Sequence, residues 1–193
     1  MTTFGGLYRY RMKDVVRVSG FDKLTPRVQF LYRRGALLNV HAERTSEKML
    51  SDALGEALQG QGNISLVEYS TDVDASALPP RYDVYCELVH TGGSGGEGGV
   101  AEEISDDELG KLASAMEAAL LPRNRTYARD RSEGYIGPLH VVRVEAGTFD
   151  KYWRYVIEDL GGDPSQFKLP RCINNDKMRA IIRDGVAAKA GAQ

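Results

Sequence analysis

The sequence is poor in the residues that build disulfide frameworks and metal cages. It has three histidines and only two cysteines, Cys86 and Cys172, which lie far apart and form no CxxC pair. Neither a disulfide scaffold nor a zinc site is therefore indicated, and a reducing cytoplasmic compartment fits best. A chain of 193 residues also needs no disulfides, because it can bury about 70% of the surface that its unfolded form exposes.

Long apolar runs and targeting signals are missing as well. No stretch approaches the roughly 18 apolar residues of a membrane span, and residues 1–6 lack the basic and apolar layout of a signal peptide. We therefore expect a cytoplasmic protein with no membrane partner. The 42% share of hydrophobic residues indicates packed structure rather than a disordered tail.

Charge is unevenly distributed behind a net value of −2. The first 45 residues carry nine Lys and Arg against three Asp and Glu, residues 46–120 carry three against fifteen, and residues 121–193 carry thirteen against nine. Two basic ends could converge on an anion such as a nucleotide phosphate. No cluster of Lys and Arg is interleaved with exposed aromatics, so we expect no nucleic-acid partner.

Hydrophobic periodicity predicts an α+β fold in which helices pack on a mostly antiparallel or mixed β-sheet. A hairpin is expected where strands 28–32 and 36–40 meet across residues 33–35, with Gly20 and Pro26 marking earlier turns. The glycine-rich segment 92–99 has no Lys-Ser/Thr ending, which indicates a surface loop rather than a phosphate-binding loop. The other expected strands are 7–11, 15–18, 64–69, 82–89 and 139–144, and helices should begin after Thr45 or Ser46, Ser105, Thr148 and Asn174–Asp176.

Few residues suggest chemistry on their own, since the histidines and cysteines show no catalytic or ligand spacing. Asp14 lies between two predicted strands, where its carboxylate could accept two ribose hydroxyls, or could simply bond within a turn. Lys168 and Arg171 lie on a proline-stiffened loop and would suit a phosphate-bearing transition state. The alternative is that both are ordinary surface cations.

Seven segments together resemble one family. The stretch GLYRYRMKDVVRVSGF at 6–21 closely resembles the third nucleotide-binding motif of the GH3 acyl-acid amido synthetases, the auxin-responsive family of the adenylate-forming superfamily. QFKLPRC at 166–172 resembles a later motif of the same family. The remaining matches follow in family order at residues 30–38, which resemble a hinge hairpin, and at 67–70, 82–88, 136–139 and 147–149.

The resemblance implies an enzyme that activates a carboxylic acid with ATP and Mg²⁺ as an acyl-adenylate and then transfers the acyl group to an amino acid. Residues 1–30 would be trailing strands of a large N-terminal domain and the approach to the hinge, and residues 31–193 would be the C-terminal lid domain. Nucleotide, carboxylic acid and amino-acid acceptor would be bound together with the N-terminal domain. The isolated 193-residue chain is expected to be inactive.

Site roles are also implied residue by residue. Asp14 would hold the ribose hydroxyls, with Tyr10 of the same motif beside the nucleotide. Lys168 would be the catalytic residue, which a mobile lid carries to the phosphate, and Arg171 would assist in binding the nucleotide. No residue is assigned to a metal.

The segment after the hinge departs from the family pattern. Arg34 and Gly35 would lie at the hinge itself, but the following Asp-Lys-Thr of the family is Glu43-Arg44-Thr45 here. Arg44 therefore replaces a lysine that contacts nucleotide. Lys13 likewise replaces a common glycine before Asp14. The alternative to the enzyme is a free-standing α+β binding or interaction module that keeps the fold without catalysis.

Overall fold

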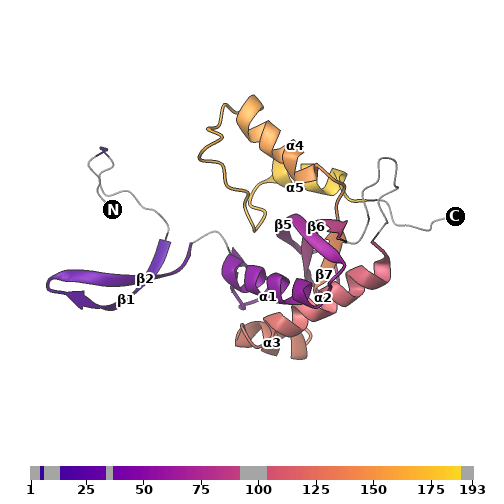
Figure 1. Cartoon of the computed structure of the whole chain (residues 1–193). Helices are drawn as coiled ribbons and strands as arrows, with labels where there is room; N and C mark the ends of the chain where they lie inside the picture. The colour runs from indigo at the N-terminus through magenta and orange to yellow at the C-terminus, as the bar shows by residue number, and fades with distance from the viewer. Residues whose placement is uncertain (1–4, 7–13, 34–36, 92–103, 188–193) are drawn as a thin grey trace.

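The N-terminal part of the chain is a β-hairpin. The computed structural model describes residues 5–6, 14–33, 37–91 and 104–187, and in it β1 (Asp14–Asp22) pairs antiparallel with β2 (Thr25–Arg33). The turn is the pair Lys23 and Leu24, and Lys23 has a φ of 55°. A positive φ at the first central residue matches the twist of a two-residue hairpin. Figure 1 shows this hairpin standing away from the remaining elements.

The expected hairpin between 28–32 and 36–40 is therefore wrong. β2 pairs with β1, whereas β3 (Leu37–Leu38) pairs with β4 (Thr45–Ser46). Gly20 lies inside β1 at a register shift and Pro26 lies inside β2, so neither marks the turn. A proline is tolerated in β2 because, among the described residues, this strand pairs on one side only. The strand expected at 7–11 falls outside the described residues.

A mixed three-stranded sheet forms the centre of the fold, as expected. β5 (Ile64–Asp74) and β6 (Arg81–His90) are antiparallel, and β7 (His140–Arg143) lies parallel to β6. The parallel pair is connected by α2 (Asp106–Leu120) and α3 (Arg125–Ser132). α3 was not expected from the sequence.

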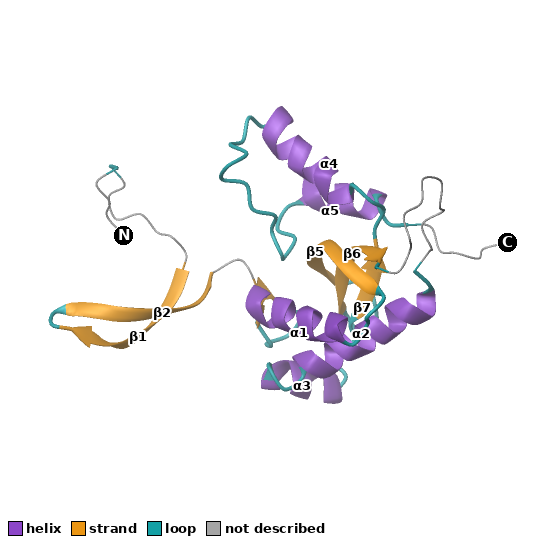
Figure 2. Cartoon of the chain, viewed as in Figure 1, coloured by secondary structure: helices purple, strands orange, loops and turns teal. Residues whose placement is uncertain are grey.

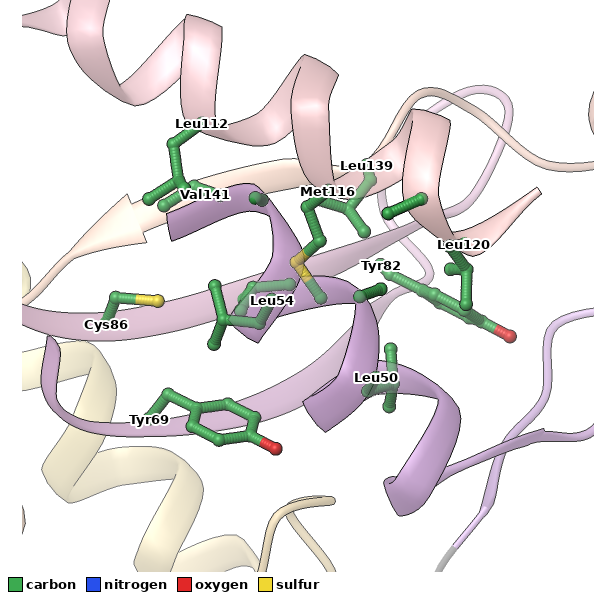
Figure 3. Packing of buried hydrophobic residues seen from close by; sticks show 14 of the residues in the cluster. Leu50, Leu54, Tyr69, Tyr82, Cys86, Leu112, Met116, Leu120, Leu139 and Val141 are labelled. Atoms are coloured by element: carbon green, nitrogen blue, oxygen red, sulfur yellow. The ribbon is translucent and has the colours of Figure 1, made fainter. Parts of the chain in front are cut away.

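Helices cover both faces of this sheet. Successive side chains of β6 point to opposite faces, and the apolar ones on each face pack against a different pair of helices. Tyr82, Val84 and Cys86 pack under α1 (Glu47–Gln59) and α2. Tyr85 packs instead with α4 (Thr148–Arg154) and α5 (Asp176–Asp184). Figure 2 shows the two helical layers, and Figure 3 shows the larger core. That core includes Leu50, Leu54, Leu112, Met116, Leu120, Leu139 and Val141.

Most predicted helix starts are confirmed. Ser46 caps α1, Asn175 caps α5, and Ser105 with Glu108 forms the full capping box of α2. Thr148 is not a cap, because its buried hydroxyl donates to the Glu145 carbonyl at 2.7 Å while Gly147 occupies the cap position. Among the described residues, no helix has the length and apolar character needed to cross a membrane.

The end of α4 also differs from the expected regular stripe. A π-helical turn, η1 (Tyr155–Asp159), continues α4. Phe149 and Tyr152 are buried as expected, but Leu160 is 62% exposed. A π-turn takes an extra residue per turn, so it rotates Leu160 out of the apolar stripe.

Candidate functional site

Residues 39–44, which connect β3 to β4 and are called the pocket loop here, border an open pocket of about 380 Å³. Its lining consists of Leu37, Asn39, His41, Ala42 and Arg44. The Asn39 side chain closes the loop, since its Oδ1 accepts the Arg44 N–H and its Nδ2 donates to the His41 carbonyl, both at 3.2 Å. The loop conformation is thus held by its own side chains.

Glu43 anchors the pocket loop to the core of the fold. Its buried carboxylate accepts the backbone N–H of Val40 at 2.5 Å and that of His41 at 2.9 Å. The hydroxyl of Tyr82 on β6 donates to the same carboxylate at 2.5 Å. Burial, together with this bond, raises the pKa of Tyr82, so the hydroxyl stays protonated. Asn124 adds a hydrogen bond to the Glu43 carbonyl at 2.8 Å.

Arg44 is presented by this anchored loop in a strained conformation. Its φ is 45°, a region that non-glycine residues seldom adopt. Such strain costs about 1–3 kcal/mol and is concentrated at functional sites. The side chain is exposed, and its guanidinium has no hydrogen bond or ion pair within the described part of the chain. The nucleotide role predicted for Arg44 stays a prediction.

His41 lines the same pocket as Arg44, and its ring is held by residues of α3 and of the segment that follows it. Its Nδ1 lies 3.3 Å from Oδ2 of Asp130 on α3, and its ring stacks on Tyr135 with centroids 4.6 Å apart. Asp130 is fully buried and also pairs with Arg129 at 2.6 Å. Burial acts to raise the pKa of Asp130, but the hydrogen bonds from Arg129 and His41 outweigh it and lower the pKa.

Sequence reasoning treated His41 as a structural or surface residue and missed this arrangement. Its partner Asp130 is 89 residues away and lies on α3, which was itself not predicted. No local pattern in the sequence connects the two.

A second loop, residues 160–171, presents the other predicted cations and is called the lysine loop here. Lys168 is exposed and has no hydrogen bond or ion pair to any residue that the structure describes. The end of the loop is attached to β5: Ser70 Oγ donates to the Pro170 carbonyl at 2.7 Å, and the Thr71 N–H donates to the Arg171 carbonyl at 2.8 Å.

Arg171 is engaged inside the protein. Its guanidinium pairs with the Glu68 carboxylate, donates to the Tyr69 carbonyl at 2.8 Å and lies 4.5 Å from the centroid of the Tyr69 ring. These contacts fasten the lysine loop to β5. The nucleotide role predicted for Arg171 is not tested by them and stays a prediction.

The pocket loop and the lysine loop leave the same core at neighbouring points. Leu38, at the start of one loop, and Cys172, at the end of the other, are both buried in the larger cluster. β3 packs against β5, and Cys172 forms a β-bridge with Thr71 of the same strand. Burial raises the pKa of Cys172 to about 12, so the thiol is unreactive at neutral pH. Arg44 is six residues beyond Leu38, and Lys168 is four residues before Cys172.

The other predicted site residues lie in or near the N-terminal hairpin. Tyr10, Arg34 and Gly35 fall outside the described residues. Asp14 is the first residue of β1, opposite Arg33 in the register. The described residues contain no group of three or more His, Cys, Asp or Glu side chains arranged to hold a metal ion.

Comparison with known proteins identifies the family to which the chain is similar. Residues 48–177 match the GH3 family C-terminal domain, and residues 1–33 match the GH3 family central domain. The chain is 34% identical to a probable indole-3-acetic acid-amido synthetase, GH3.2, of Oryza sativa subsp. japonica, over 98% of this chain and 30% of that protein. It is also 34% identical to the jasmonoyl–L-amino acid synthetase GH3.5 of the same subspecies, over 96% and 30%.

A solved structure agrees with these sequence matches. The fold resembles that of the GH3.15 acyl acid amido synthetase with a TM-score of 0.76 and 29% identity, covering 97% of this chain and 32% of that one. The chain thus spans about 30% of the length of the curated relatives that it matches. The match to the GH3 family C-terminal domain, residues 48–177, covers well over half of the chain, and the chain therefore belongs to the GH3 family.

Proposed function

We propose that this chain is the C-terminal portion of an ATP-dependent acyl-acid amido synthetase. Such an enzyme forms an acyl-adenylate from a carboxylic acid and ATP, with Mg²⁺, and passes the acyl group to an amino acid. Family membership and the names of the relatives support the reaction class. The observation that carries the proposal for this chain is the pair of exposed cations, Arg44 and Lys168, on two anchored loops that both leave the core next to β5.

Lys168 is proposed to act in the first half-reaction. A carboxylate oxygen attacks the α-phosphorus of ATP, the bond to the bridging oxygen breaks, and pyrophosphate leaves. Negative charge develops on the phosphoryl oxygens, and an ammonium group placed beside them stabilises that transition state. Lys168 suits this role because its charge is not neutralised by any described carboxylate.

The second half-reaction needs different groups around the same acyl carbonyl. The amine nitrogen attacks the carbonyl carbon, the bond to the AMP oxygen breaks, and the amine loses a proton as the amide forms. We propose that the body carrying Lys168 turns about residues 34 and 35, so that adenylation and transfer use different faces. Hinges of this kind absorb a rotation in a few connecting residues, and Arg34 and Gly35 lie between the hairpin and the body.

Carboxylic-acid-dependent exchange of pyrophosphate into ATP tests the proposal in the protein as its gene encodes it. The acids to try are indole-3-acetate, jasmonate and 4-substituted benzoates, which are those of the relatives' names. Lys168→Ala should slow the exchange about a hundredfold, the usual cost of losing one charge-stabilising donor. Lys151→Ala is the matched control, because Lys151 is also exposed and has no described ion pair.

Two results would contradict the proposal in different ways. Unimpaired exchange in Lys168→Ala would remove Lys168 from its assigned role and leave the enzyme class standing. Absence of acid-dependent exchange with every acid would favour the binding module over the synthetase.

A further inference from the structure

The pocket beside the pocket loop has the charge of an anion site. Arg44 supplies one permanent positive charge and His41 supplies a titratable one. Asn39 contributes a neutral amide, and no carboxylate is present among the described lining residues. The two carboxylates that contact the loop, Glu43 and Asp130, are buried and engaged in hydrogen bonds.

The geometry also determines which nitrogen of His41 is available. Asp130 accepts from Nδ1, so that this nitrogen carries a proton, and the stacking on Tyr135 restricts the plane of the ring. Nε2 has no partner among the described residues. A histidine whose first nitrogen is bound to a carboxylate has its tautomer and orientation set by that bond. The free nitrogen is therefore the one that a ligand meets.

We propose that His41 is a second anion-binding residue beside Arg44, and that Asp130 is the positioning residue that holds it. The ligand is a phosphate or pyrophosphate group. Its identification as part of ATP rests on the proposed function, whereas the existence of an anion site does not. Nε2 donates to a phosphate oxygen only when it is protonated, so binding of the anion is coupled to protonation of His41.

The charges that face His41 favour an anion over the ammonium group of an amino acid. Neutral His41 would offer the lone pair of Nε2 to an ammonium group, but Arg44 in the same pocket repels such a ligand. Asp130 of α3 is bonded to the ring through Nδ1 and is itself paired with Arg129, whose guanidinium also lies 3.9 Å from the Glu133 carboxylate at the end of α3. From the pocket loop, Glu43 is directed at backbone N–H groups rather than into the pocket.

Sulfate is the best probe of the site, because its charge does not change between pH 6 and 8. We expect sulfate titrated into the 193-residue chain to shift the Cε1–H resonance of His41 in NMR spectra. His41→Gln keeps a donor toward Asp130 but removes the charge, and should weaken sulfate binding about tenfold or more, as expected for a lost charge-assisted hydrogen bond. Wild-type affinity for sulfate should be higher where His41 is protonated than where it is neutral, and this pH dependence should be absent in His41→Gln.

His140 provides a matched control. Its Nδ1 also lies 3.3 Å from a carboxylate, that of Asp83, and its side chain is 49% exposed against 47% for His41, but it lies outside the pocket. His140→Gln should bind sulfate as the wild type does. Asp130→Asn should weaken binding less than His41→Gln and should change the His41 resonance before any anion is added.

Equal sulfate affinity of wild type and His41→Gln, or a His41 resonance that sulfate does not move, would overturn the proposal. If His41→Gln fails to fold, the movement of the wild-type His41 resonance on addition of sulfate decides, because a histidine outside the anion site would not respond. Titration with AMP and with pyrophosphate then separates the nucleotide phosphate from the leaving group. An intact anion site without ATP–pyrophosphate exchange would refute the synthetase and leave this inference standing, and the converse result would refute only the inference.

Discussion

Replacing Tyr82 by phenylalanine is the sharpest test of how the pocket loop is anchored. Tyr82 is fully buried on β6 and stacks on Tyr127 with ring centroids 5.3 Å apart, and the substitution keeps this aromatic packing. What it removes is the hydroxyl that donates to Glu43 at 2.5 Å and lies 2.9 Å from the Thr45 hydroxyl. The Glu43 carboxylate would remain buried with one donor fewer.

The expected cost follows from the charge of the acceptor. A hydrogen bond to an ionised group contributes about 1.5–3 kcal/mol, and a buried group left without its partner is penalised by a similar amount. For a chain of this size each kcal/mol lowers Tm by about 2–4 °C. Tyr82→Phe should therefore lower Tm by about 3–12 °C.

Thermal and urea unfolding followed by circular dichroism measure this loss. Tyr135→Phe is the control, because Tyr135 is 50% exposed and its hydroxyl has no partner among the described residues; its effect should stay within about 0.5 kcal/mol. Combining Tyr82→Phe with Glu43→Gln should show a coupling of about 1 kcal/mol or more. A Tm for Tyr82→Phe within about 1 °C of wild type would refute the anchoring role of the hydroxyl.

Two further predictions concern packing and pH. A Cβ on Gly185 would lie 2.3 Å from Thr148 Oγ1, so Gly185→Ala should destabilise the fold by about 1–3 kcal/mol in urea unfolding; Gly110→Ala, which meets nothing within 4 Å on α2, should instead stabilise it by up to about 1 kcal/mol, and equal effects of the two would contradict this account. The capping box lowers the pKa of Glu108 to about 2 through hydrogen bonds from Ser105, so its stabilisation is complete above the unfolded pKa of about 4.3 and is lost as the pH falls toward 2. Glu108→Gln should remove that part of the acid dependence, and an unchanged acid-unfolding curve would rule it out.

Local rules predicted the elements whose signals are local. Ser46, Ser105 and Asn175 cap helices because their side-chain oxygens accept from a backbone N–H three residues ahead. The residue types that make such caps can be recognised in a short stretch of sequence. The sheet strands β5 and β6 were found through their apolar content. Each of these predictions depends on fewer than about a dozen consecutive residues.

The elements that were predicted wrongly or missed lack the usual local signal. The β1–β2 turn uses Lys23 at positive φ where a glycine would have been the signal. α3 is strongly charged, and its buried residues are Tyr127 and Asp130, so it has no apolar stripe to recognise. Only Asn124, as its cap, marked its start.

The candidate site divides in the same way. Lys168 was singled out from its proline-stiffened loop and Arg44 from the family resemblance, and the roles assigned to both stay predictions. His41 could not be found, because its meaning depends on Asp130, which tertiary packing brings beside it from a distant part of the chain. Single-sequence patterns carry no information about such a pair.

The attachment of the lysine loop to β5 limits how far Lys168 can travel. Backbone hydrogen bonds on both sides of Thr71 hold Arg171 and Ile173 against the strand edge. Lys168 is three residues from Arg171, and even a fully extended tether of that length reaches only about 10–11 Å. A position of the Lys168 Cα farther than this from Arg171 cannot be produced by the loop alone. Such a position would require the sheet and its helices to move together as one body. For the proposed lid motion we therefore expect substitutions between β2 and β3, and not at Gly161 or Gly162, to affect the motion.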